Sequence, residues 1–280
     1  MSQERIDTHQ HFWRYNAQEY GLMGPGLETL RQDRLPDDLA PLLKGAGVDG
    51  TVAVQARQTV DESHWLLELA DRYPFILGVV GWVDLRSPSV DEDLAKLSRH
   101  PRFCGVRHVV QDEPDDQFLL GDDFVRGIGK LARYGLKYDL LLYPRQLPAA
   151  QKLVERFHDQ PFILDHISKP FIKDRRLEPW AADIRRLAAM PNVACKISGM
   201  VTEADWKNWK PADFTPYLDI VLECFGTKRL MVGSDWPVCT LAGDYSSVMK
   251  LAGDYISKLS RDEQDAVWSG NARRWYGLPV

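Results

Sequence analysis

The sequence predicts a (β/α)8 barrel of the TIM type, with some distortion allowed, formed by residues 1–280 as one domain. Three observations support this class. Short apolar segments alternate with helical patterns, eight such segments occur, and no linker or low-complexity stretch divides the chain. Alternating strands and helices indicate parallel βαβ units. The length of 280 residues is close to the roughly 250 residues of an ordinary barrel of this kind.

The predicted strands are short apolar runs bounded by polar residues. They are Arg5–Thr8, Thr51–Gln55, Phe75–Val83, Gly105–Val109, Lys137–Leu142, Phe162–His166, Val193–Ser198 and Leu230–Ser234. An open, doubly wound sheet is the alternative topology, but no GxGxxG sequence follows the first strand to support it. We therefore favour the closed barrel.

Helical patterns separate these strands, at Ser63–Tyr73, Val90–Arg99, Asp122–Tyr134, Leu147–Phe157, Trp180–Met190 and Phe214–Phe225. The tail Arg261–Tyr276 predicts a terminal helix, and Ser260 and Glu263 have the spacing of a capping box. Two connections are long, Trp13–Asp33 and Lys169–Glu178. Loops that follow barrel strands lie on the catalytic face, so we expect these two to act as lids.

The composition is that of a soluble globular protein, with 44% hydrophobic residues, 27% charged residues and a net charge of −5. This acidic balance argues against a general nucleic-acid or membrane-surface binder and favours a small polar substrate. No apolar run approaches the ~20 residues of a membrane span. The polar N-terminus has no signal-peptide core, which favours the cytoplasm.

Four cysteines are widely spaced and form no CxxC pair: Cys104, Cys195, Cys224 and Cys239. Three of them lie in apolar stretches, which is typical of buried, reduced thiols. Disulfides or a thiolate metal site are the less favoured alternatives. A reducing cytoplasm fits this pattern.

The strongest local motif is Asp7-Thr8-His9-Gln10-His11, at the end of the first predicted strand. Strand side chains alternate between faces, so Asp7, His9 and His11 are expected to point the same way. Two imidazoles at one strand end can bind a metal ion, and Asp7 can orient them. The alternative interpretation is a pair of polar loop histidines.

Two further motifs end the sixth and eighth predicted strands. His166 closes the apolar run before Ser168, and Asp235 follows Gly233-Ser234. Each has a structural alternative, because His166 can be a capping or surface residue and Asp235 can begin a turn before a proline. If the strand count is right, both lie on the same rim as the histidine pair, where a carboxylate can bind a metal or accept a proton.

These motifs together resemble the amidohydrolase superfamily, whose signature of HxH, His and Asp is matched by His9, His11, His166 and Asp235. The stretches IDTHQHFW, ILDHISKP, CKISGM and MVGSDWP are similar to the sugar-lactonase branch of that superfamily. The similarity extends from about Arg5 to Tyr276. It implies a small-molecule substrate, L-fucono-1,5-lactone or a related aldonolactone, which is hydrolysed to the sugar acid.

The sequence departs from the metal-rich members of that superfamily. The fourth predicted strand offers Arg107 and His108 where those members carry Lys or Glu, and the fifth contains no histidine. The resemblance therefore implies one divalent metal rather than two, with the ligands His9, His11, His166 and Asp235. Ligand chemistry favours zinc, held weakly or dispensable for turnover.

The resemblance also assigns catalytic roles. Asp235 is expected to act as general base on water, and the metal, or His166 with Arg107, is expected to polarise the lactone carbonyl. An arginine fork suits paired oxygen acceptors. The alternative for Arg107 is a salt bridge to Asp112 or Glu113.

Five more residues are candidate substrate contacts: Trp13, Gln55, Trp82, Lys196 and Trp236. The tryptophans follow three strands and offer flat platforms for a sugar ring. Gln55 ends a strand, and Lys196 places a charge inside an apolar strand. The structural alternatives are loop packing for the tryptophans, a turn for Gln55, and an ion pair with a barrel carboxylate for Lys196.

Two other functions remain open at this point. A metal-dependent decarboxylase on the same barrel would release carbon dioxide instead of acid, but the missing histidine of the fifth strand argues against it. A non-catalytic sugar-acid binding protein would show saturable binding without turnover, and the presence of Asp235 and both N-terminal histidines argues against that.

Overall fold

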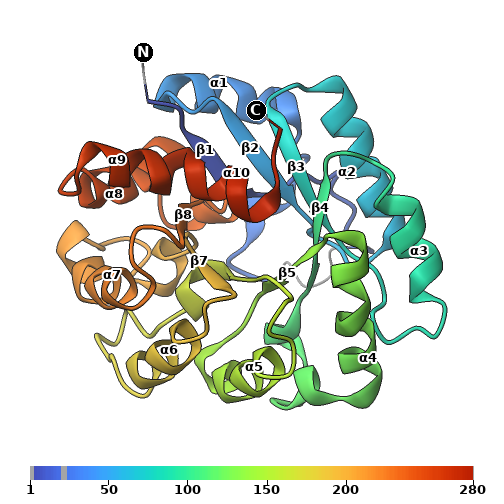
Figure 1. Cartoon of the computed structure of the whole chain (residues 1–280). Coiled ribbons are helices and arrows are strands. Elements are labelled where there is room, and N and C mark those ends of the chain that lie inside the picture. Colours follow the sequence, from blue (N-terminus) through green and yellow to red (C-terminus); the bar gives the residue numbers. More distant parts are fainter. Residues whose placement is uncertain (1–2, 20–23, 280) are drawn as a thin grey trace.

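A computed structural model describes residues 3–19 and 24–279 and shows eight parallel strands ringed by helices (Figure 1). The strands follow one another around the sheet in chain order, which confirms the predicted barrel. They are β1 (Ile6–Gln10), β2 (Gly50–Val54), β3 (Ile76–Gly81), β4 (Phe103–His108), β5 (Lys137–Leu140), β6 (Phe162–Leu164), β7 (Val193–Ile197) and β8 (Leu230–Val232). Every predicted strand is present, but β3, β5, β6 and β8 end two residues earlier than predicted, and β1 ends two residues later.

The barrel closes where β1 meets β8, through backbone bonds just beyond the end of β8. The His11 N–H donates to the Trp236 carbonyl over 2.7 Å, and the Asp235 N–H donates to the His9 carbonyl over 2.8 Å. Gln10 and Trp236 form an isolated parallel bridge. The closing seam therefore consists of the residues that the sequence singled out for chemistry.

The principal helices lie outside the strands and alternate with them (Figure 1). They are α1 (Pro36–Ala46), α2 (Val60–Arg72), α3 (Val90–Leu97), α4 (Asp122–Leu131), α5 (Leu147–Val154), α6 (Trp180–Ala188), α7 (Pro211–Phe225) and α8 (Tyr245–Ile256). Neither α1 nor α8 was among the predicted helices. Proline and glycine within α1 and a Ser-Ser pair in α8 lower the intrinsic helix propensity there, and packing of buried faces on the barrel offsets this. Within the described part of the chain, no helix is long and apolar enough to cross a membrane.

The C-terminal segment is not the single helix that the sequence predicts. It consists of α9 (Arg261–Asp265), a π-helical turn at Ala266–Gly270 and α10 (Asn271–Tyr276). The predicted capping box is confirmed, because both the N–H and the hydroxyl of Ser260 donate to Glu263. Helix α10 lies at the end of the barrel where the strands begin (Figure 1).

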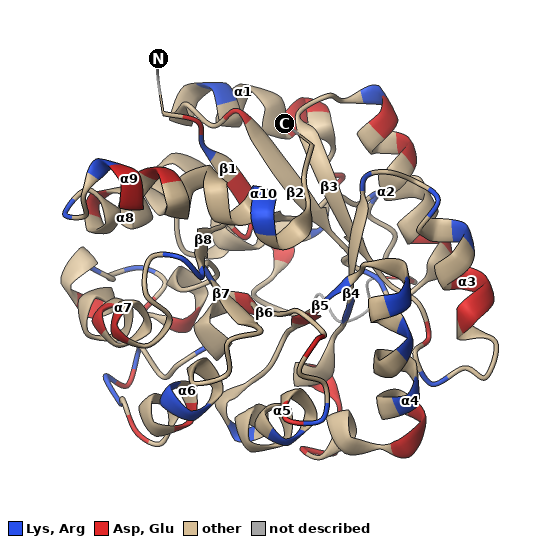
Figure 2. Cartoon of the chain, in the orientation of Figure 1, with Lys and Arg blue, Asp and Glu red and all other residues tan. Residues whose placement is uncertain are grey.

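The barrel interior is layered. The end that α10 covers is apolar, and Tyr276 and Leu278 pack there with side chains from seven strands: Ile6, Val52, Val54, Val80, Cys104, Ile163, Ala194 and Met231. Toward the other end, the interior becomes ionic, with Arg107, Asp139, Asp165 and Lys196 all buried. A larger apolar cluster fills the space between the strands and the outer helices, which carry most of the charge on their outward faces (Figure 2).

The two loops expected to act as lids are both anchored by short antiparallel bridges. Trp13 pairs with Arg34, and Phe171 pairs with Arg176. Residues 20–23 of the first loop lie outside the described residues. A closing motion of either loop stays a prediction.

Candidate active site

Strand β1 carries a bulge that separates Asp7 from the histidines. Asp7 is paired with Thr51 and Gln10 with Ala53, so three residues of β1 span two of β2. A bulge breaks the alternation of side chains. The prediction that Asp7 shares a face with His9 and His11 is therefore wrong.

Asp7 instead faces α8, outside the strands. Its carboxylate accepts hydrogen bonds from the Ser234 N–H at 2.8 Å, the Ser234 hydroxyl at 2.6 Å and the Tyr245 hydroxyl at 3.1 Å. It also accepts the His9 N–H at 3.1 Å. Burial raises the pKa of Asp7 to about 6. The residue fixes the backbone of the bulge to the loop that bears Asp235, and it contacts neither imidazole.

Three imidazoles surround one carboxylate oxygen at the seam. The Nε2 atoms of His11, His166 and His9 lie 3.3, 3.8 and 3.9 Å from Asp235 Oδ1. All four side chains are buried. The structure thus brings together the four residues that the sequence predicted as metal ligands.

The outer nitrogens of the imidazoles have fixed partners. His11 Nδ1 lies 2.8 Å from the Val54 carbonyl, and His9 Nδ1 lies 3.2 Å from Asp165 Oδ1. In a neutral His11 ring the carbonyl requires the proton on Nδ1 and leaves the Nε2 lone pair facing Asp235. His9 Nδ1 also lies 3.2 Å from the Lys196 ammonium, but the Arg107 donor at Nε2 places the ring proton on Nδ1. His166 Nδ1 contacts the Ser198 hydroxyl at 2.9 Å, which can donate or accept, so this ring can carry its proton on either nitrogen.

Burial sets the charge states of the cluster. It lowers the pKa of His9 and His166 well below the ordinary value, so both rings are neutral near neutral pH. Burial alone would raise the pKa of Asp235, but the neighbouring His166 and His11 hold it below the ordinary value. The site therefore combines an ionised carboxylate with two neutral imidazoles, those of His9 and His166.

The two loops that present His166 and Asp235 have unusual backbones. His166, Ile167, Ser168 and Lys169 form four consecutive residues with φ between 47° and 59°, and Asp235 has φ 58°. A left-handed conformation costs an L-residue about 1–2 kcal/mol. Such conformations persist where the surroundings over-determine them, which is typical of functional sites.

Gly199 gives the His166 ring its space, and replacing it tests that position. Gly199 has φ +58°, and a Cβ there would lie 2.4 Å from His166 Nδ1. We expect Gly199→Ala to displace the ring and to lower kcat/KM by about a hundredfold, the typical cost of a 1 Å misplacement. Gly45→Ala is the matched control, because nothing lies within 4 Å of a Cβ at that position. Full activity of a folded Gly199→Ala protein would contradict this role.

Arg107 is fully engaged by protein acceptors. Its Nε and Nη2 donate to Gln55 Oε1 at 3.1 and 2.7 Å, and Nη2 also donates to the Gln55 carbonyl. Its Nη1 donates to Asp165 Oδ2 at 3.2 Å and to His9 Nε2 at 3.3 Å. The alternative partners Asp112 and Glu113 were wrong, because the ion pair is with Asp165. Substrate contacts of Arg107 and Gln55 stay predictions, and each side chain would need to exchange a partner to make one.

Lys196 is the cation of a buried ionic cluster. Its Nζ lies 2.6 Å from Asp139 and 2.9 Å from Asp165, and all three side chains are fully buried. Burial opposes its charge, but the two carboxylates hold the pKa of Lys196 above the ordinary value. The Tyr276 hydroxyl of α10 donates to Asp139 over 2.6 Å. The ion-pair interpretation of Lys196 is confirmed.

The three candidate tryptophans have protein partners. The Trp13 indole N–H donates to the Gln32 carbonyl at 2.9 Å, and that of Trp82 donates to His108 Nδ1 at 3.2 Å. Trp236 is buried in the outer apolar cluster, edge-on to Phe12. Trp82 is half-buried and retains exposed surface. A platform role for any of them stays a prediction.

Sequence reasoning assigned no role to several polar residues around the site. Asp165 precedes His166 and links His9, Arg107 and Lys196. Ser198 lies two residues after Lys196, and strand alternation places both on the inward face, so a site role for Ser198 could have been predicted. Lys169 and Glu203 lie 3.9 Å apart on loops after β6 and β7, and nothing in a single sequence connects them.

The residues present fit a single divalent ion. One nitrogen each of His9 and His11 and one oxygen of Asp235 lie within 4.8 Å of one another. Neutral imidazoles with a carboxylate are the donor set that zinc accepts. The partners of the Nδ1 atoms are the second shell that orients such ligands.

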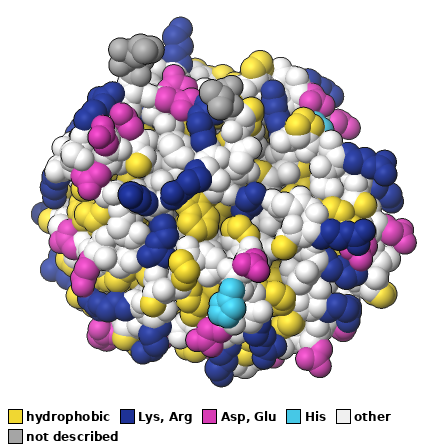
Figure 3. Space-filling view, viewed as in Figure 1, with side chains coloured by type: hydrophobic (Ala, Val, Ile, Leu, Met, Phe, Trp, Pro, Cys, Tyr) yellow, Lys and Arg dark blue, Asp and Glu magenta, His cyan; other side chains and the backbone are white. Residues whose placement is uncertain are grey.

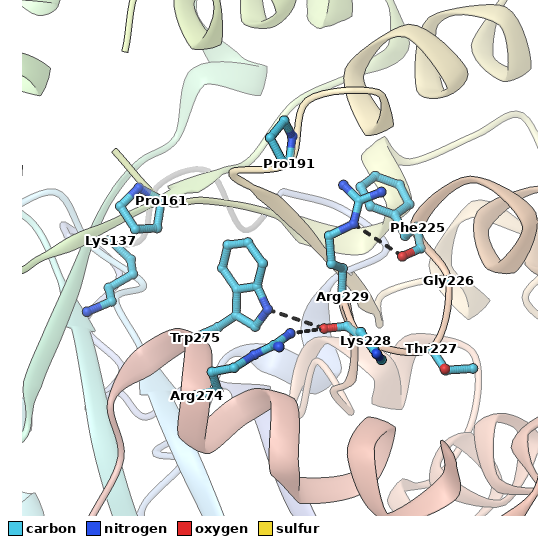
Figure 4. A pocket seen from close by; sticks show the side chains of 10 residues that line it. All are labelled: Lys137, Pro161, Pro191, Phe225, Gly226, Thr227, Lys228, Arg229, Arg274 and Trp275. Carbon is cyan, nitrogen blue, oxygen red and sulfur yellow. Dashed lines mark hydrogen bonds between the residues drawn. The ribbon is translucent and has the colours of Figure 1, made fainter. Parts of the chain in front are cut away.

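A large hollow of about 880 Å³ lies at the opposite end of the barrel, beside the starts of β5 to β8 (Figure 4). Its lining includes Lys137, Lys228, Arg229 and Arg274 and contains no carboxylate. Figure 3 shows this basic, partly apolar face. Arg229 and Arg274 donate to backbone carbonyls there. None of the predicted site residues lines this hollow, so it is separate from the imidazole cluster.

Comparison with known proteins identifies a family. A family model described as Amidohydrolase matches residues 6–278. A protein of Burkholderia multivorans named L-fucono-1,5-lactonase is 44% identical over 290 residues, covering 100% of this chain and 98% of the relative. One of Burkholderia ambifaria with the same name is 38% identical over 278 residues, covering 98% and 96%.

Solved structures give the same result for the fold. The crystal structure of an amidohydrolase from Burkholderia multivorans with bound Zn has a TM-score of 0.94 and 44% identity, covering 99% of this chain and 100% of that one. A 2-pyrone-4,6-dicarboxylic acid hydrolase from Pseudomonas putida has a TM-score of 0.78 at 21% identity, covering 100% of both chains. The second likeness extends to the fold alone.

Proposed function

The chain belongs to the amidohydrolase family, and on that premise we propose that it hydrolyses a sugar lactone of the L-fucono-1,5-lactone class to the sugar acid. The names of the two Burkholderia relatives, which match over nearly their whole length, support this substrate class. The observation in this chain that carries the proposal is the ionised Asp235 among three imidazoles. A carboxylate next to an oxyanion-stabilising group is what ester hydrolysis by water requires.

Asp235 acts as the general base. It takes a proton from water as the water oxygen attacks the lactone carbonyl, and a tetrahedral oxyanion forms. The bond from that carbon to the ring oxygen then breaks, and Asp235 returns the proton to the leaving alkoxide. Its lowered pKa keeps it ionised before the reaction.

His166 stabilises the oxyanion. When the Ser198 hydroxyl donates to Nδ1, the ring carries its proton on Nε2 and can donate to the developing negative charge. Removing one such donor typically costs about 10²–10³-fold in rate. Arg107 holds His9 and Asp165 in place and acts through them.

One divalent ion, zinc, is the cofactor that these residues fit, held by His9, His11 and Asp235. When bound, such an ion polarises a carbonyl and lowers the pKa of water. A hydrolase acting on a reactive cyclic ester needs only a modest acceleration, so the ion can be weakly held.

The decarboxylase alternative is not favoured. β5 contains no histidine, and its one carboxylate, Asp139, is occupied by Lys196 and Tyr276. We also keep the expectation of a reducing cytoplasm, since all four cysteines are free and three of them are buried.

The test is a panel of freshly prepared aldonolactones, with initial proton release followed against a blank without enzyme. We expect fast turnover of a deoxyhexonolactone and no carbon dioxide from aromatic or muconate-type acids. A flat lactone panel would contradict the proposed function, and carbon dioxide release would establish the alternative.

A further inference from the structure

Arg107 donates to the same atom that a metal ion would use. Its Nη1 lies 3.3 Å from His9 Nε2, which is the nitrogen of His9 that faces Asp235 in the candidate zinc site. We propose that the Arg107 guanidinium and the metal ion compete for His9 Nε2, so that the folded protein alternates between a guanidinium-bound and a metal-bound form. This inference rests on the zinc site described above but not on the identity of the lactone.

The competition follows from the valence of the imidazole. His9 Nδ1 lies 3.2 Å from both Asp165 Oδ1 and the Lys196 ammonium, whereas Nε2 faces the Arg107 donor, so the proton of the neutral ring belongs on Nδ1, toward Asp165. A neutral ring then has a single lone pair, on Nε2. That lone pair can accept from Arg107 or bind a metal ion, but it cannot do both.

The Arg107 guanidinium is held next to His9 by other residues, so it is in position to compete with a metal ion. Gln55 and Asp165 hold the guanidinium on its other sides, and only 3% of the residue is exposed. Because the guanidinium is planar and its N–H donors are fixed in that plane, Arg107 releases His9 by a small tilt of the whole group while Gln55 and Asp165 remain its partners. A divalent ion at His9 would also be repelled by this nearby cation, and burial leaves that repulsion poorly screened.

The first test measures zinc affinity by competition with a chromophoric chelator, on protein stripped of metal and without substrate. We expect Arg107→Met to bind zinc about 10- to 100-fold more tightly than the wild type, the equivalent of one hydrogen bond to a charged group. Lys169→Met is the matched control. Lys169 is another cation close to the cluster, and its ammonium contacts Glu203 and the ring of Tyr143.

An affinity gain confined to Arg107→Met supports competition at His9. Equal gains in both variants would overturn it, because long-range charge repulsion would then explain the effect. No gain in either variant would also overturn it, because Arg107 would then not oppose zinc binding. If the wild type hydrolyses no lactone but Arg107→Met still binds zinc more tightly than the wild type, the proposed function is rejected and this inference stands.

The second test uses the wild type and so does not depend on how well a variant folds. Side-chain ¹⁵N NMR of the metal-free protein should show a His9 Nε2 that accepts a hydrogen bond and a protected Arg107 Nη1 proton. Zinc addition should shift the first signal and expose the second. An Arg107 signal that zinc leaves unchanged would refute the proposal.

Discussion

Replacing Asp235 by asparagine is expected to lower kcat for lactone opening by at least about 10²–10⁴-fold, the usual contribution of a positioned base. Asparagine preserves the shape of the side chain but cannot accept the proton of water. The fold should survive, because the bond that places this residue in the seam is its backbone N–H to the His9 carbonyl. Steady-state kinetics and thermal melting of the same preparation check both parts.

Two comparisons test whether Asp235 acts as a base, rather than only as a metal ligand or as one more negative charge. Asp112→Asn is the matched control, since Asp112 is an exposed carboxylate on a loop at the same end of the barrel. Hydroxylamine is a nucleophile that depends less on a base than water does, so it should restore part of the lactone opening in Asp235→Asn. Near wild-type hydrolysis by the variant would refute the role of Asp235.

Lys196→Met is expected to produce the largest loss of stability, about 3–5 kcal/mol in the free energy of unfolding. The substitution keeps the length of the side chain but leaves Asp139 and Asp165 buried without their shared cation. A loss of this size is a large fraction of the ~5–15 kcal/mol that holds a typical domain folded. Urea titration followed by circular dichroism measures it.

Lys250→Met is the control, because Lys250 forms an exposed pair with Asp254, and such pairs contribute about 0–1 kcal/mol. Adding Asp139→Asn to Lys196→Met should recover part of the loss.

The stability of Lys196→Met should also depend on pH. Burial already raises the pKa of Asp139 to about 6, and removing the Lys196 charge should raise this pKa further. The folded variant then binds more protons than the unfolded chain, so its stability should increase as pH falls from about 7 to about 5. A loss below about 1 kcal/mol would contradict the ionic account.

The barrel was predictable because its signal is repeated along the chain. Each strand is an apolar run with a helix after it, and errors of one or two residues at strand ends do not alter the count. The convergence of His9, His11, His166 and Asp235 followed from that count, because the ends of parallel strands share one rim.

The details that failed depend on backbone irregularities that a periodic pattern does not contain. The bulge in β1 turned Asp7 away from the histidines, and only the register against β2 reveals it. The left-handed turn after β6 displaced His166 from the strand. Arg107 was paired by proximity in sequence with Asp112 and Glu113, whereas its partner, Asp165, lies 58 residues away.

The seam between β1 and β8 has a consequence for the order of assembly during synthesis. The contacts that position Asp235 against His9 and His11 join residues more than 220 positions apart, so they close almost the longest loop that the chain allows. A nascent chain that still lacks β8 holds both histidines yet has no reaction centre. Since long-range contacts form late and at high entropic cost, catalytic competence should appear only with the final closure of the barrel. Enzymatic turnover is therefore a reporter of complete folding, and a partially assembled barrel does not hydrolyse the substrate.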